Sequence, residues 1–226
     1  MTTRAQRLTI ARTVEPTGEP VVFDGLDSLA EVGVKQHLRL DDGGEQVFVE
    51  GLITAARQHV ERVTGRSLML QTWRLTLDGF PAGRLNDDRS PAIEGDDLLL
   101  PYPNLLAVTS IKYDDVDGTE QTIDAADYRA QVDDVPGRIA LAYGKSWPST
   151  RGHAGGVRVL YTAGYSAGVT LAAQRAAVPQ SIKLAILLLV GHWFEHRESV
   201  VVGTMSSSLQ FTVDSLLSPN TCSEMW

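Results

Sequence analysis

The spacing of apolar residues predicts two helices in the N-terminal part of the chain. Ser28 is a suitable N-cap for a short helix that runs to about Leu38. A longer helix is predicted from about Glu45 to Thr64, because apolar residues recur there every three or four positions and Gly65 follows as a stop. Charged residues such as Arg57 and Glu61 are assigned to its solvent side. Its predicted core-packing positions are Phe48, Leu52, Ala56 and Val60.

From Leu70 the apolar period changes to two, which is typical of half-buried strands. Asp117-Gly118 is a hairpin signal that joins two of the strands, and the sequence 134–137 is typical of another turn. Short strands joined by turns favour an antiparallel sheet or small barrel over a βαβ arrangement. The predicted strands are Trp73–Leu77, Ala107–Tyr113, Thr119–Ile123, Tyr128–Val132, Arg138–Tyr143 and Val157–Thr162.

The helical period returns at Val178, and Pro179 suits a first helical turn. The helix is apolar nearly all the way round, so we expect it to lie inside the core, with Ile186, Leu189 and Trp193 as packing residues. A polar cluster is predicted at its end, formed by His192, Glu195, His196, Arg197 and Glu198. Beyond a serine-rich linker, an apolar stretch is predicted to dock onto a partner through Leu209, Phe211, Val213, Leu216 and Leu217.

These elements predict an α+β fold, in which N-terminal helices and a buried C-terminal helix form the core and an antiparallel β region is inserted between them. Extended arms are expected at both ends. The predicted divisions are an arm over 1–27, a helical part over 28–68, a β region over 69–166, a core helix over 178–200 and a docking tail over 203–226.

Charge argues against nucleic acid as the main ligand. The chain carries 28 acidic and 20 basic residues, a formal net charge of −8. An acidic surface repels phosphate, and no basic stripe interleaved with aromatic residues is present in the sequence. The only strongly apolar run, 182–194, is too short for a membrane span, which needs ~20 apolar residues. We therefore expect no membrane association.

Two short motifs resemble catalytic signatures. His192-Trp193-Phe194-Glu195-His196 matches H-x-x-E-H, in which two histidines one helical turn apart bind zinc and the glutamate acts as a base. A working site needs a third protein ligand from another element, and few candidates follow in the sequence. We therefore interpret the motif as the polar end of a buried helix and predict no metal site.

The second motif, Gly164-Tyr165-Ser166-Ala167-Gly168, matches the G-x-S-x-G nucleophile elbow. That elbow needs a parallel sheet, followed in the chain by an acid and then a histidine. Here the preceding strands are predicted antiparallel, and the only acid between Ser166 and the last histidine is Glu195, directly before His196. We interpret the motif as a turn and predict no enzymatic activity and no cofactor.

The order and spacing of many short segments resemble the phage head–tail connector, or adaptor, family. The resemblance spans roughly residues 28 to 219, although the N-terminal arm and the last seven residues depart from the family pattern. The segments that carry it are Val34–Asp41, Leu52–Arg57, Val60–Arg66, Gln71–Trp73, Phe80–Pro81, Leu100–Pro101, Ile111–Tyr113, Ser146–Pro148, Tyr161–Tyr165, Val178–Pro179, Ala185–Leu189, Trp193–Glu198 and Leu216–Pro219.

The resemblance implies a structural virion protein, made in the bacterial host cytoplasm and located in the neck of a tailed-phage particle. It implies a dodecameric ring of identical subunits beneath the portal, which extends the DNA channel without sequence-specific DNA binding and docks the tail or a stopper protein. The apolar tail is then expected to bind the portal or a neighbouring subunit. Alternatives are another neck component, such as a stopper or tail-completion protein, and a zinc or serine hydrolase using the motifs above.

Overall fold

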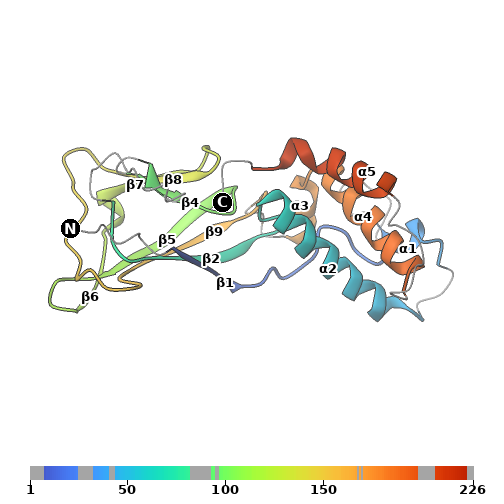
Figure 1. Ribbon diagram of the computed structural model, residues 1–226, viewed down its shortest axis with the longest axis horizontal. Helices are drawn as coiled ribbons and strands as arrows, with labels where there is room; N and C mark the ends of the chain where they lie inside the picture. The colour runs from blue at the N-terminus through green and yellow to red at the C-terminus, as the bar shows by residue number, and fades with distance from the viewer. Residues whose placement is uncertain are drawn as a thin grey trace. The chain divides into compact units, whose positions relative to one another are not determined.

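The computed structural model describes residues 8–24, 33–40, 44–81, 93–94, 97–166, 168, 170–197 and 207–222. The chain divides into two compact units, each with its own hydrophobic core (Figure 1). The β unit comprises Met1–Glu15, Gln71–Gly164 and Cys222–Trp226, and the helical unit comprises Pro16–Leu70 and Tyr165–Thr221. The α+β class predicted from the sequence is confirmed.

Two antiparallel sheets make up the β unit. The first has five strands in the order β1 (Thr9–Val14), β2 (Gln71–Leu77), β9 (Val157–Ala163), β5 (Leu105–Asp114) and β6 (Glu120–Thr122). The second has four, in the order β3 (Ile93–Glu94), β4 (Asp97–Leu100), β8 (Gly137–Leu141) and β7 (Tyr128–Gln131), with the 3-10 helix η1 (Ala125–Asp127) before β7.

Buried and more exposed residues alternate along the central strands, and the buried ones form one face of the five-stranded sheet. In β9 every second residue is buried, and β2 shows the same period in register with it. Tyr161 on β9 is fully buried and donates a hydrogen bond of 2.6 Å from its hydroxyl to the carbonyl oxygen of Pro101. Burial raises the pKa of Tyr161 far above its ordinary value, so the hydroxyl remains a donor.

The turn predicted at Asp117-Gly118 joins β5 to β6 as an antiparallel hairpin. Gly118 has φ +87°, a left-handed conformation that residues with a side chain rarely adopt. The Asp115 side chain accepts hydrogen bonds from the backbone N–H groups of Asp117 and Thr119. The hairpin prediction is therefore confirmed, and its acidic residues serve the turn.

The helical unit contains five α-helices among the described residues. They are α1 (Val34–His37), α2 (Gln46–Thr64), α3 (Leu171–Ala177), α4 (Gln180–Glu195) and α5 (Ser207–Leu217), and the 3-10 helix η2 (Ser218–Asn220) follows α5. The stop at Gly65 is confirmed, since this residue ends α2 with φ +66°. Helix α4 packs against both α2 and α5 (Figure 1), and most of its apolar residues are buried or partly buried, as predicted.

Several elements differ from the predictions. Strands β1, β3 and β4 and helix α3 were not predicted, because each is short and has no sustained period of its own. Gly33 has an extended conformation and forms a parallel bridge with Val22, so the first helix begins at Val34 rather than running continuously from Ser28. Ser28 itself lies outside the described residues.

Candidate interaction surfaces

The predicted core positions on α2 and α4 lie in the core of the helical unit, with one exception. Ala56, Val60, Ile186 and Leu189 are buried there, and Leu52 and Trp193 are partly buried against the same cluster. The prediction for Phe48 is wrong, because 42% of its surface is exposed. The buried stripe of α2 is rotated from the predicted one, and its members are Val49, Ile53, Ala56, Arg57, Val60, Glu61 and Thr64.

The rotation buries two charged residues that the sequence assigned to solvent. Arg57 and Glu61 are both 2% exposed, and the Arg57 Nη1 atom lies 2.8 Å from Glu61 Oε2. The Arg57 Nε atom donates to Glu19 Oε2 at 2.7 Å, and the Glu61 carboxylate accepts from the backbone N–H of Leu68 at 3.1 Å. One guanidinium thus fixes the segment around Glu19 to α2. The spacing of Arg57 and Glu61 is a sequence signal for this pair, but nothing in the sequence links them to Glu19.

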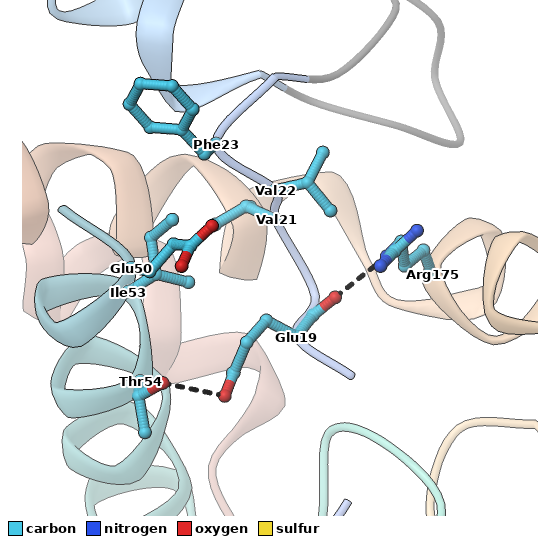
Figure 2. A pocket seen from close by; sticks show the side chains of 8 residues that line it. All are labelled: Glu19, Val21, Val22, Phe23, Glu50, Ile53, Thr54 and Arg175. Atoms are coloured by element: carbon cyan, nitrogen blue, oxygen red, sulfur yellow. Dashed lines mark hydrogen bonds between the residues drawn. The ribbon is translucent and has the colours of Figure 1, made fainter. Parts of the chain in front are cut away.

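Glu19 also borders a pocket in the helical unit (Figure 2). Its carboxylate accepts a hydrogen bond of 3.0 Å from the Thr54 hydroxyl, and its backbone carbonyl accepts one of 3.0 Å from Arg175 Nε. Burial raises the pKa of Glu19, although Arg57 and Thr54 oppose the shift. The pocket has a volume of about 310 Å³ and is lined by Glu19, Val21, Val22, Phe23, Glu50, Ile53, Thr54 and Arg175.

The apolar residues of the predicted docking tail lie on α5, and most of them pack within the same chain. Val213 and Leu217 are 4% and 1% exposed, and Leu209 and Leu216 are partly buried against the same core. Only Phe211 points away, with 75% of its surface exposed. The prediction of a free docking segment is therefore wrong for Val213 and Leu217, since a helical spacing of apolar residues lets α5 cover its own core.

Polar contacts hold the end of this segment to the helical unit. The Arg66 Nε atom donates to the backbone carbonyl of Asn220 at 2.6 Å. The side-chain amide of Asn220 donates to the Ser181 hydroxyl at 3.1 Å. Helix α5 and η2 are thus fixed to α4 and to the end of α2.

The polar cluster at the end of α4 serves helix packing. Arg197 pairs with Glu45 at 2.6 Å, and its guanidinium carbon lies 4.7 Å and 4.3 Å from the ring centres of Phe48 and Phe194. Phe48 is therefore covered on one side by Arg197, which explains how an exposed aromatic residue is accommodated.

The H-x-x-E-H residues share this helix end. His196 is the C-cap, its ring Nδ1 lies 3.0 Å from the carbonyl oxygen of His192, and the two imidazole centres are 4.5 Å apart. Glu195 is exposed, and Glu198 lies outside the described residues. Within the described ranges, no group of three or more His, Cys, Asp or Glu side chains is placed to hold a metal ion.

Ser166 of the G-x-S-x-G motif lies in a turn after β9. Its hydroxyl accepts a hydrogen bond of 3.0 Å from the backbone N–H of Gly168, and Gln174 donates to the Gly168 carbonyl. A nucleophile elbow requires a parallel sheet before the serine. Strand β9, which precedes Ser166, is instead antiparallel to both of its neighbours.

A network of charges lies across β5, β6 and β9 of the β unit. Arg158 donates to Asp114 at 2.6 Å and to Glu120 at 2.9 Å, and Lys112 donates to Glu120 at 2.7 Å. His153 Nε2 lies 3.1 Å from the Asp114 carboxylate. Arg158 lowers the pKa of Asp114, and Lys112 together with Arg158 lowers the pKa of Glu120.

Acid is therefore expected to weaken the β unit. A carboxyl group with a lowered pKa in the folded state contributes stability above its unfolded-state pKa, here 3.8 for Asp114. That contribution is lost as the pH falls through the folded-state value. The difference in melting temperature between the wild-type protein and Asp114→Asn should be largest near neutral pH and shrink as the pH falls through the acidic range. A difference that is the same at every pH would contradict the assignment.

No single helix of the described chain is long and apolar enough to cross a membrane. Helices α3 and α4 together meet the criteria of length and composition, but the chain bends by 99° between them.

Comparison with known proteins identifies the family. The head completion protein family matches residues 29–219. Because the match covers most of the 226 residues, the chain belongs to this family. No curated protein sequence matches the chain.

Among the solved structures that share the fold, three come from gene transfer agent particles. A chain from the neck of an empty particle, computed with sixfold symmetry, is 24% identical with a TM-score of 0.65 and covers 94% of this chain and 95% of its own. One from a native virion is 23% identical with a TM-score of 0.64 and covers 94% of both chains. A third chain, from a native neck computed with twelvefold symmetry, is 21% identical with a TM-score of 0.56. The match covers 88% of this chain and 93% of that one.

Proposed function

We propose that this protein is a structural head–tail connector of a tailed-phage or phage-like particle. Membership of the head completion protein family is the observation that carries the proposal. The shared fold supports it, because similar chains occur in the necks of gene transfer agent particles and match nearly the whole length of this one. The protein acts by binding other proteins and not as an enzyme, which agrees with the structural roles of His192, Ser166 and their neighbours.

The proposed assembly is a ring of twelve identical subunits beneath the portal. Sixfold and twelvefold symmetry were used for the necks that contain similar chains, and both are compatible with a dodecamer. Contacts between two different surfaces of one subunit close into a ring when the rotation between neighbours divides a full turn. The portal lies on one side of this ring, and a stopper or tail protein lies on the other.

DNA passes through the ring without sequence-specific contacts. A net charge of −8 favours this role, because an acidic channel wall repels phosphate and lets the genome slide. The prediction is that a reconstruction of the assembled ring has acidic and neutral side chains along its channel. A channel lined by lysine and arginine would contradict it.

Mixing with the portal tests the connector role. The purified protein should be combined with the cognate portal ring and imaged by electron microscopy. A second ring of density stacked on the narrow end of the portal is the expected result. Free portals beside unbound protein would contradict the connector role and favour a different neck component, such as a stopper or tail-completion protein.

A further inference from the structure

The helical unit presents two unlike surfaces that complement each other. One is the pocket between the segment 19–23, α2 and Arg175 of α3 (Figure 2). The other is the exposed side of α5, whose opposite side packs on α4. Because the pocket is lined from elements other than α5, one subunit can use both surfaces at the same time.

The pocket has the size and chemistry to receive one large apolar side chain. Its volume of about 310 Å³ lies at the low end of the range for ligand pockets, roughly 300–1,000 Å³. Val21, Phe23 and Ile53 provide buried apolar wall. Charged groups stand beside this wall, namely the exposed Glu50 and the partly exposed Arg175. An aromatic ring would bury well here, with polar partners around it.

Phe211 is the most exposed aromatic side chain in the described part of the helical unit, where Val47 of α2 is also largely exposed. Phe211 is 75% exposed, although its neighbours in the apolar pattern of α5 are buried or partly buried. Asp214 is exposed one turn further along the same helix. Residues three apart share a helix face, so Phe211 and Asp214 form one surface with an aromatic ring and a negative charge.

We propose that Phe211 of one subunit inserts into this pocket of the next subunit around the ring, where Asp214 lies against Arg175. The arrangement joins two different surfaces, so each subunit receives one neighbour and enters the other, as ring closure requires. Two carboxylates also line the pocket, but Glu19 is paired with Arg57, and Glu50 accepts a hydrogen bond from Gln46. The opposite charges of Asp214 and Arg175 therefore favour a second copy of this chain as the occupant. The proposal rests on the proposed ring-forming function.

Substitution of Phe211 tests the contact in the full-length chain. Phe211→Ser should leave the subunit folded, because the side chain is exposed, and should weaken each contact between subunits by about 30-fold, the loss typical of a central aromatic anchor. Electron microscopy should then show portals without a complete second ring. Tyr143→Ser, which alters an exposed aromatic residue of the β unit, is the matched control and should form the ring normally.

Ring formation by the wild-type protein on the portal distinguishes failure of the proposed function from failure of the proposed contact. Failure of the wild-type protein to decorate the portal would overturn the proposed function and the contact with it. Complete rings formed by Phe211→Ser on portals that the wild-type protein also decorates would overturn the contact alone.

Crosslinking tests whether the pocket of a second copy is the occupant. Phe211→Cys and Val22→Cys should be combined in a Cys222→Ser background, since Cys222 is the single native cysteine. Oxidation of the assembled rings should give a ladder of covalent multimers on a non-reducing gel, whereas either cysteine alone should not. Monomers only, in rings that assemble normally, would overturn the proposal and direct attention to Phe211 as a contact with the portal.

Discussion

Replacing Arg57 by methionine is expected to lower the free energy of unfolding by about 3–5 kcal/mol, the usual loss when one partner of a buried ion pair is removed. Arg57 and Glu61 are each 2% exposed, and Glu19 lies against the same guanidinium. The substitution keeps the apolar part of the side chain but removes the positive charge that pairs with the carboxylates of Glu19 and Glu61. Fewer hydrogen bonds then offset the free-energy cost of burying these carboxylates.

Urea denaturation followed by circular dichroism at the helical minimum measures this loss. The matched control is Arg62→Met, because Arg62 lies on the same helix and is exposed. A surface substitution of this kind should change the free energy of unfolding by about 0.5 kcal/mol or less. Equal effects of the two substitutions would show that the buried network does not stabilise the unit.

Replacing Leu217 by alanine is expected to lower the free energy of unfolding by about 2–5 kcal/mol, since a buried leucine is removed and a cavity is left. Leu217 is 1% exposed and belongs to the core that α2 and α4 form. Phe211→Ala on the same helix is the control and should cost little, because that ring contacts mainly solvent in the single subunit. Denaturation of both variants under the same conditions provides the comparison.

The Leu217 result also bears on the C-terminal tail as a whole. A segment that only docks onto a partner could be deleted, from Thr204 to the end, without loss of the fold. Helix α5 instead covers part of the core, so we expect that deletion to expose Val178, Ile186 or their neighbours and to destabilise the helical unit. A deletion variant as stable as the wild-type protein would contradict the packing of α5.

Elements with a long, self-contained apolar period could be predicted from the sequence. Helix α2 begins and ends within a residue of its expected bounds, and most of the apolar residues of α4 are buried or partly buried, with Leu184 exposed. The central strands were recognised from a period of two, because their alternate residues face a core formed within the same unit. In these elements the local pattern and the tertiary packing agree.

Elements that depend on distant partners could not be predicted in the same way. Strand β1 is an edge strand whose pairing with β2 joins residues about sixty positions apart, and its own side chains are mostly exposed. Arg57 was assigned to solvent because a charged residue is rarely buried, and the carboxylates of Glu19 and Glu61 compensate its burial here. Phe48 was assigned to the core because a large apolar residue is usually buried. In the structure it is partly exposed, and the Arg197 guanidinium lies over its ring.

Particles made by cells that lack this protein provide the most direct test of the connector role. The producing strain should be deleted for the gene, and its particles should be purified and imaged by electron microscopy. Assembled heads without tails are the expected result, with tailed particles restored when the wild-type protein is supplied. Complete tailed particles in the absence of the protein would contradict the connector role.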